Sequence, residues 1–212
     1  MEQQLKDIKA WLGVGSVNIF GLPMSGKDTV GVRLAENLGA KFLSSGMIIR
    51  AMEEEKGVNL SGEGNLIPSN TFYEWILPYF EREDLWNYPL ILSSIGRWAG
   101  EEDEVMTVAR SSGHTIRAVV ELRLSEQDVV ERWEAAKLLG DRGLRPDDAN
   151  PDIFRKRLEE YRNKTLPVLK HYQELGLLIS VPANLSRDQV FAKVVEALAN
   201  FSKRTHDFSP VL

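Results

Sequence analysis

The sequence contains no cysteine, and that absence removes several classes of function at once. It excludes a disulfide scaffold, a thiol nucleophile and any metal site built on thiolates. Histidine is scarce as well: His114, His171 and His206 stand far apart and show no metal-ligand spacing. We therefore expect histidine to have neither a catalytic nor a metal-binding role.

An excess of positive charge and long apolar runs are also missing. The 26 Lys and Arg are outnumbered by 31 Asp and Glu, which gives a net charge of -5 and no global basic field for nucleic acid. No apolar run reaches the roughly 18–20 residues that a membrane span needs. Residues 1–13 include Glu2 and Asp7 and lack the apolar centre of a signal peptide. We expect a cytoplasmic protein that binds neither nucleic acid nor a membrane.

The chain instead carries an alternation of strand and helix patterns. Its 212 residues, 43% of them hydrophobic, suit one domain whose core is large enough to fold without a disulfide or a structural metal. Short apolar runs predict strands at 16–20, 41–43, 89–92, 115–124 and 177–181. Helical spacing predicts helices at 2–12, 29–38, 47–55, 68–80, 98–110, 129–139, 151–175 and 186–201. Residues 58–68 and 140–150 read as loops, and 202–212 as a frayed tail. This pattern predicts an α/β protein whose central parallel sheet of about five strands is covered by helices on both faces.

The most specific local motif is GLPMSGK at residues 21–27, which fits G-x-x-x-x-G-K between a predicted strand and a predicted helix. In that context backbone N–H groups surround a phosphate, the helix N-terminus adds its positive dipole end, and Lys27 reaches the terminal phosphates. Gly21 and Gly26 allow the tight turn and the close backbone approach. Asp28 stands where the motif usually has Ser or Thr, and Thr29 follows one step later. The motif predicts a phosphate-binding loop.

Further motifs give the chain a resemblance to the adenylate kinase family of nucleoside monophosphate kinases: GLPMSGKDT, SSGMIIRA, GNLIP, and RPDD followed by RKRLEEY. The similarity runs from about residue 17 to residue 198, in the family's order and spacing. It implies a P-loop NTPase-type three-layer α/β/α fold. Residues 1–13 lie before the region of similarity, and their helical spacing predicts an extra N-terminal helix. The resemblance also implies a helical acceptor-binding insert at about 44–80 and a short lid without zinc at about 138–150.

The reaction that the resemblance implies is reversible, Mg²⁺-dependent transfer of the ATP γ-phosphoryl group to a nucleoside monophosphate, with AMP as the favoured acceptor. Such a reaction belongs to nucleotide biosynthesis. Phosphoryl transfer needs positioning and positive charge rather than covalent work by the protein. Arginines suit it because the guanidinium group is always charged and binds oxygens in pairs.

The resemblance also implies roles for individual residues. It implies a catalytic role for Lys27, Arg97, Arg132, Arg145 and Arg157, with Arg132 stacked on the donor adenine and the last two bridging the phosphates under the lid. It implies ATP binding by Met24, Ser25, Gly26, Lys27, Asp28, Thr29, Arg132 and Leu185. It implies acceptor binding by Ser45, Arg50, Asn65, Leu66, Ile67, Ser94, Arg97, Glu101, Arg145 and Arg157.

Several positions depart from the family pattern. Ser93 and Met47 stand where the family has aspartates, the first of which holds the water shell of Mg²⁺. Of the pattern Asp-Gly-Phe-Pro-Arg only Arg97 is kept, and Glu101 replaces a glutamine that reads the acceptor adenine. Ala136 stands where the family has a second lid arginine, and Lys137, Arg142 or Arg155 could substitute for it. One extra residue also lies between Asp148 and Arg157.

Two acidic residues each have two interpretations. Asp28 could take over part of the Mg²⁺-holding role, because a carboxylate is a good hard-oxygen ligand, or it could be an acid favoured by the helix dipole. An ionised Glu101 can only accept hydrogen bonds, so it could accept one from the amine of adenine or cytosine, or from the guanine edge. The alternative for Glu101 is a solvated acid in the run EEDE at 101–104.

The remaining expectations concern packing and rival functions. We expect one group of aromatic residues to be core rather than a base-stacking platform: Phe72, Tyr73, Trp75, Tyr79, Phe80 and Trp86. The N-terminal helix could pack on its own domain or on another chain, and a monomer is expected. The alternative functions are a kinase for CMP, UMP or another small acceptor, and a catalytically weak nucleotide-binding module that acts as a sensor. Ser93 and Met47 favour the last alternative.

Overall fold

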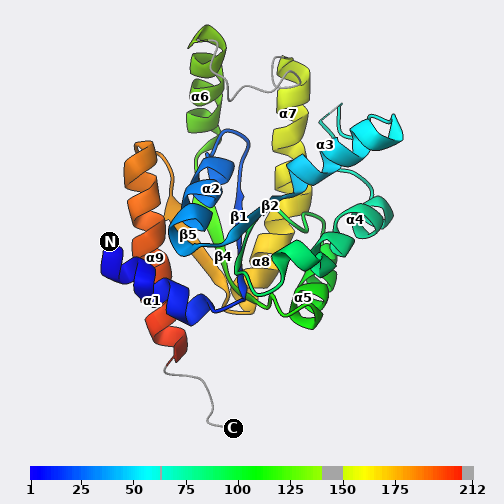
Figure 1. Ribbon diagram of the computed structural model, residues 1–212. Coiled ribbons are helices and arrows are strands. Elements are labelled where there is room, and N and C mark those ends of the chain that lie inside the picture. Colours follow the sequence, from blue (N-terminus) through cyan, green and yellow to red (C-terminus); the bar gives the residue numbers. More distant parts are fainter. Residues whose placement is uncertain (63, 140–149, 207–212) are drawn as a thin grey trace.

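The computed structural model describes residues 1–62, 64–139 and 150–206, which fold around one parallel β-sheet (Figure 1). The strands lie in the order β2-β3-β1-β4-β5, with bounds β1 Ser16–Gly21, β2 Lys41–Ser44, β3 Leu90–Ser93, β4 Ile116–Arg123 and β5 Leu178–Pro182. All neighbouring strands are parallel. Every residue of β1 and β3 is buried, so both strands read as short, mostly apolar runs. The predicted α/β fold with a parallel sheet of about five strands is confirmed.

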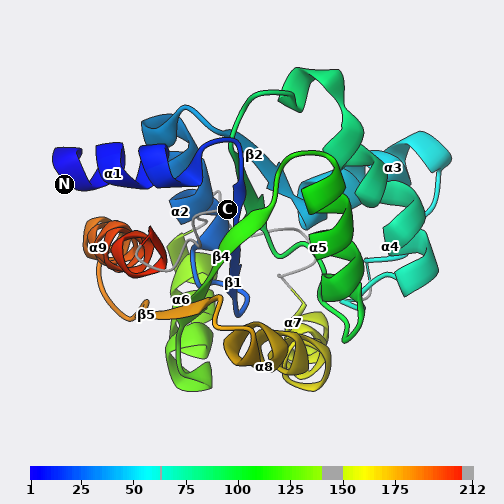
Figure 2. The ribbon, with the colours of Figure 1, turned by 90° about the horizontal axis from the view of Figure 1, so that it is seen from below.

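Helices cover both faces of the sheet (Figure 2). One face is covered by α1 (Glu2–Leu12), α2 (Lys27–Leu38) and α9 (Arg187–His206), and the other by α5 (Glu101–Ser111) and α8 (Leu166–Glu174). The alternation of side chains along β1 builds both cores. Val17 and Ile19 pack under α2 and α9, whereas Phe20 packs near Tyr172 of α8 with 6.1 Å between ring centroids. Asn18 lies between Val17 and Ile19 and therefore points toward the α5 and α8 face.

The N-terminal helix packs on its own chain, against α9. The rings of Trp11 and Phe201 meet edge to face with 6.1 Å between centroids, and Trp11 Nε1 donates a hydrogen bond of 3.0 Å to Thr205 Oγ1. α9 therefore continues to His206, and the expected frayed tail is wrong for residues 202–206. The reason is that Trp11 of α1 contacts Phe201 and Thr205, which the local sequence does not reveal.

The helix predicted over residues 68–80 is broken into two pieces. The structure has α4 (Ser69–Trp75) and then a separate 3-10 turn, Leu77–Glu81, followed by a second short one, Glu83–Leu85. Pro78 explains the break, because it has no N–H to donate to the carbonyl one turn back and its ring crowds that turn. The prediction of one continuous helix is wrong here.

The aromatic side chains of this segment pack as expected, with one exception. Phe72, Trp75 and Phe80 are buried in the core, so the prediction of core packing is confirmed for them. Trp86 is 54% exposed, so the same prediction is wrong for that residue.

The helix predicted over residues 151–175 is interrupted near its middle. It consists of α7 (Pro151–Glu160), a π-helical turn (Tyr161–Thr165) and α8. Pro167 lies in the first turn of α8, where its missing N–H is accommodated by the wider turn before it. The prediction of one long helix is therefore confirmed in extent, since the three contiguous pieces run on in one direction (Figure 1), but its middle turn is π-helical rather than α-helical.

The carboxyl ends of the central strands lead directly into the segments that form the site. β1 ends at Gly21 before residues 22–26, and β2 ends at Ser44 before α3 (Ser45–Lys56). β3 ends at Ser93, and a loop follows before α5. α6 (Glu126–Leu139) rises from the same edge, beyond β4 (Figure 1). In parallel sheets this edge is where ligands bind.

The longest helix described is α9, with 20 residues, and it carries charged side chains along its length. Among residues 1–62, 64–139 and 150–206, no helix combines the length and the apolar character that crossing a lipid bilayer requires.

Candidate active site

The loop between β1 and α2 turns sharply over residues 22–26. The backbone φ angle is positive at Met24 (64°) and at Gly26 (84°), and glycine adopts that conformation at no steric cost. A Cβ on Gly21 would lie 2.5 Å from Ser25 Oγ, so only glycine fits there. Ser25 is 2% exposed, and its hydroxyl has no hydrogen-bond partner among the described residues. A buried hydroxyl beside the first N–H groups of a helix suits an anionic ligand.

A cavity of about 570 Å³ lies over this loop and is strongly basic. All eight residues predicted to bind ATP line it: Met24, Ser25, Gly26, Lys27, Asp28, Thr29, Arg132 and Leu185. Among the described residues, its cationic side chains are Lys27, Arg33, Arg132, Arg157 and Arg187. Asp28 is the one acidic side chain in that lining. We call this space the donor cavity. Its charge suits a polyanion such as a triphosphate.

Arg132 of α6 ties two walls of the donor cavity together. Its Nη1 donates to the carbonyl of Met24 at 3.2 Å, and its Nη2 donates to the carbonyls of Ala183 at 2.5 Å and Leu185 at 3.5 Å. Burial lowers the pKa of Arg132 from its usual value, an effect that the charge of Asp128 opposes. The guanidinium plane is thus fixed between the phosphate loop and the segment after β5.

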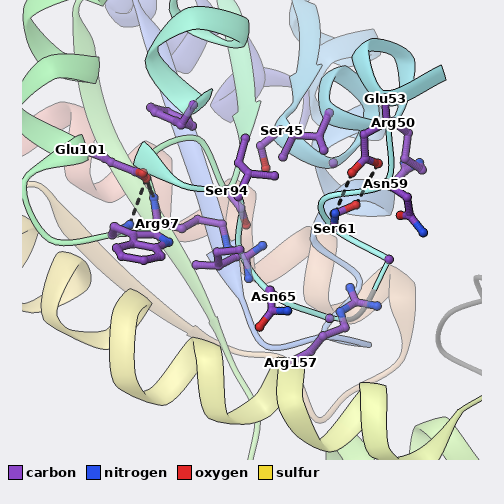
Figure 3. A pocket seen from close by; sticks show the side chains of 18 residues that line it. Ser45, Arg50, Glu53, Asn59, Ser61, Asn65, Ser94, Arg97, Glu101 and Arg157 are labelled. Atoms are coloured by element: carbon purple, nitrogen blue, oxygen red, sulfur yellow. Dashed lines mark hydrogen bonds between the residues drawn. The ribbon is translucent and has the colours of Figure 1, made fainter. Parts of the chain in front are cut away.

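A second cavity, of about 380 Å³, lies between α3, residues 57–68 and the loop after β3 (Figure 3). Nine residues predicted to bind the acceptor line it: Ser45, Arg50, Asn65, Leu66, Ile67, Ser94, Arg97, Glu101 and Arg157. We call it the acceptor cavity. It combines two arginines that can bind a phosphate, Arg50 and Arg97, with the aromatic side chains of Phe72 and Trp98. Arg157 of α7 lines both cavities, so the two adjoin at that residue.

The loop that carries Arg97 is held from two sides. Asn18 Nδ2 donates to the carbonyl of Ile95 at 2.7 Å, and the N–H of Ile95 donates to Asn18 Oδ1 at 3.3 Å. On the other side, Glu101 Oε2 accepts from the N–H groups of Arg97 at 2.8 Å and Trp98 at 3.0 Å (Figure 3). Glu101 Oε1 accepts from the Ser69 hydroxyl at 2.7 Å. The backbone at Arg97 is therefore fixed by two buried side chains.

Two further acidic residues brace residues 57–68 beside the acceptor cavity. Glu53 of α3, 8% exposed, accepts from the N–H groups of Leu60 at 2.7 Å and Ser61 at 2.6 Å. Glu160 of α7, 9% exposed, accepts from the N–H of Leu66 at 3.1 Å and from Lys164 Nζ at 2.6 Å. The described residues of this segment, 57–62 and 64–68, lie outside the helices and strands, so these carboxylates satisfy backbone groups that secondary structure would otherwise satisfy.

Comparison with known proteins decides the family. The chain is 33% identical over 189 residues, 86% of its length, to adenylate kinases from Mycobacterium bovis (strain BCG / Pasteur 1173P2) and Mycobacterium tuberculosis (strain ATCC 25618 / H37Rv), and covers 98% of each. It is 32% identical over 195 residues to an adenylate kinase from Thermus thermophilus, covering 88% of this chain and 99% of that one. The chain belongs to the adenylate kinase family. It is therefore a phosphotransferase.

Family models and solved structures were compared with the chain as well. No family model matches the chain. A gluconokinase from Sinorhizobium meliloti 1021 has a similar structure, with a TM-score of 0.62, 18% sequence identity, and coverage of 92% of this chain and 98% of that one. At that identity the likeness concerns the fold, which is that of a P-loop kinase.

Within this adenylate kinase family member, the position of Glu101 corrects one expectation. Glu101 is 3% exposed and accepts three hydrogen bonds, so the interpretation as a solvated surface acid is wrong. Glu102 is buried as well and accepts from the N–H of Gly100 at 2.7 Å. The run EEDE misleads because its first two acids reach back from the start of α5 to backbone N–H groups of the preceding loop, which have no partner in secondary structure.

Asp28 and Ser93, two of the unusual positions, are in direct contact. Ser93 Oγ donates to Asp28 Oδ1 at 2.5 Å, so the end of β3 is joined to the first turn of α2. Among the described residues there is no group of three or more His, Asp or Glu side chains that could hold a metal ion.

The predicted lid lies mostly outside the described residues, and with it Arg145 and the alternative Arg142. Of the other substitutes for the second lid arginine, Lys137 lies 4.4 Å above the ring of Trp133, and Arg155 pairs with Asp152 at 3.0 Å. Neither lines the donor or the acceptor cavity, whereas Ala136 lines the donor cavity.

Proposed function

We propose that this protein catalyses reversible transfer of the γ-phosphoryl group of ATP to a nucleoside monophosphate, with AMP as the favoured acceptor, so that ATP and AMP give two ADP. The observation that carries the proposal is the pair of adjoining cavities. One is built on the phosphate loop, the other contains Arg50 and Arg97, and Arg157 lines both. A phosphoryl donor and a phosphate-bearing acceptor bound there would meet at one cationic side chain.

The chemistry that we propose needs no base and no covalent intermediate, because an oxygen of the acceptor phosphate is itself the nucleophile. Lys27 and the backbone of residues 22–26 bind the donor phosphates, while Arg50 and Arg97 hold the acceptor phosphate in line. Arg157 stabilises the charge on the transferred group, and Arg145 is proposed to join it from outside the described residues. Fixed positive charge of this kind stabilises a phosphoryl-transfer transition state without reorganisation.

The choice of AMP is supported by Glu101 and by the names of the relatives. An ionised carboxylate has about four sites for hydrogen bonds. Oε2 already accepts two N–H donors and Oε1 one hydroxyl, which leaves one site, on Oε1. A single amine, as on adenine or cytosine, fits one site, whereas the paired N–H groups of guanine would need both oxygens. Uracil offers no amine.

A divalent cation fits the donor cavity on its donor chemistry, because Asp28 and Thr29 line it and present hard oxygens. Bound there, Mg²⁺ would neutralise charge on the ATP phosphates. We propose that the chain works as a monomer in the cytoplasm, where ATP and nucleoside monophosphates are supplied.

The experiment that tests the acceptor is a coupled assay with Mg-ATP and AMP, CMP, GMP, UMP or dTMP at equal concentrations. We expect the highest kcat/KM with AMP, measurable turnover with CMP, and little with the other three. Glu101→Gln keeps an acceptor oxygen and places here the glutamine that reads adenine in the family, so we expect this variant to retain the preference for AMP. A preference for GMP or UMP in the unmodified protein would refute the proposed role of Glu101.

A further inference from the structure

The contact between Ser93 and Asp28 joins two elements at the base of the donor cavity. Ser93 is the last residue of β3 and is 1% exposed, and Asp28 is partly buried in the first turn of α2. The 2.5 Å hydrogen bond from Ser93 Oγ fixes the orientation of the Asp28 carboxylate. Asp28 follows directly after Lys27, the first residue of α2.

This carboxylate stands in a place that would otherwise repel the ligand. The donor cavity is lined by five cationic side chains and, among the described residues, by one acidic side chain, Asp28. A negative charge beside a polyphosphate weakens its binding unless a cation lies between them. A helix dipole favours an acid at this position in the empty protein, but it does not remove that repulsion.

The donor set around Asp28 is the kind that Mg²⁺ takes. Mg²⁺ is held by one or two carboxylates together with waters and substrate phosphates, rather than by a cage of protein side chains. Asp28 offers the carboxylate, Thr29 a neighbouring hydroxyl, and Ser93 a partner that orients the carboxylate. Partners that orient a metal ligand affect metal affinity by about 10–100-fold when removed.

We propose that Asp28, oriented by Ser93, is the side chain that binds the divalent cation of the nucleotide complex. The inference rests on the proposed use of Mg-ATP and does not depend on the acceptor. Asp28 strengthens binding of ATP when the cation is present and weakens it when the cation is absent. Ser93 acts as a positioning residue.

The test is calorimetric titration of the full chain with ATP, without any acceptor, in excess Mg²⁺ and again in EDTA. For Asp28→Asn, which keeps the size of the side chain and can still accept from Ser93, we expect opposite changes. ATP affinity should fall about tenfold with Mg²⁺, because the nucleotide and the cation bind cooperatively through this carboxylate. It should rise several-fold in EDTA, because a charge that repels the phosphates is removed. Binding of Mn²⁺ to the ATP complex, followed by electron paramagnetic resonance, should weaken in parallel.

Two further variants test the pairing. The Mg²⁺-dependent gain is the factor by which ATP binds more tightly in excess Mg²⁺ than in EDTA. Ser93→Ala should lower this gain, but by less than Asp28→Asn does. The exchange variant Asp28→Ser/Ser93→Asp keeps a hydroxyl and a carboxylate in contact and should restore most of the gain that Asp28→Ser alone loses. Circular dichroism melting of each variant shows whether it is folded.

The proposal is overturned if Asp28→Asn changes ATP affinity by the same factor with Mg²⁺ and in EDTA. It is likewise overturned if the variant changes ATP affinity in neither condition. An acid that serves only to start α2 would give one of these results. It is also overturned if the folded exchange variant recovers nothing. A failure of the proposed kinase function looks different, because unmodified protein would then show Mg²⁺-dependent ATP binding but no transfer to any monophosphate.

Discussion

Removing the Glu101 side chain should loosen the backbone that carries Arg97. In Glu101→Ala the N–H groups of Arg97 and Trp98 lose their acceptor, and so does the Ser69 hydroxyl. A buried donor left without a partner costs about 1–3 kcal/mol. Because these N–H groups border a cavity that water can enter, we take the lower end for both and expect a loss of about 2 kcal/mol in the free energy of unfolding. For a chain of this size that lowers the melting temperature by about 4–8 °C.

The same variant should separate the two substrates in steady-state kinetics. We expect kcat/KM for the acceptor to fall by about 10–100-fold, because misplacing a binding group by about 1 Å has an effect of that size. KM for ATP should change little, since the donor cavity does not include Glu101. Glu101→Gln retains an acceptor oxygen for the two N–H groups, so it should recover most of the lost stability.

Glu104→Ala is the matched control, because Glu104 lies on the same helix, three residues further on, and is exposed. The reasoning is refuted if Glu101→Ala melts at the same temperature as Glu104→Ala. It is also refuted if both variants retain the acceptor kinetics of the unmodified protein.

Three more variants test other parts of the site and the core. Asn18→Ala removes both hydrogen bonds to Ile95, so we expect a loss of about 2 kcal/mol in urea denaturation and a lower kcat/KM for the acceptor alone. Arg132→Ala releases the contact between the phosphate loop and the segment after β5, so KM for ATP should rise about tenfold while KM for the acceptor stays within twofold. Burial raises the pKa of Tyr172 above its usual value near 10, so the unfolded chain loses this proton first and stability falls as the pH rises above about 10. In urea denaturation at several alkaline pH values, Tyr172→Phe should reduce that fall by up to about 1.4 kcal/mol per pH unit.

The elements that local sequence dictates are predictable. Glycine spacing between a strand and a helix predicts the phosphate loop, and the structure has the loop in that place with positive φ at Gly26. Prolines inside helical patterns are harder to interpret. Pro78 ends a helix, whereas Pro167 is accommodated by a π-helical turn, and the difference depends on what the neighbouring turns pack against.

The residues that brace the site are not predictable in the same way. Asn18 is one polar residue inside an apolar strand pattern, and that mismatch is the available signal. Glu53 and Glu160 give no signal, because each satisfies backbone groups that are distant in sequence or lie in an irregular segment. Ser93 and Asp28 each depart from the usual pattern, but 65 residues separate them, so their contact requires the fold.

The most direct test of the account is to incubate the protein with Mg²⁺, AMP and ATP labelled in its γ-phosphoryl group, with Lys27→Ala as the control. We expect the label in the β-position of newly formed ADP, with two ADP formed for each ATP and AMP consumed, and no transfer in the control. Label found only in inorganic phosphate, or clear ATP binding without any transfer to AMP or another monophosphate, would contradict the proposed kinase. That result would leave a protein that binds nucleotides without transferring phosphate between them.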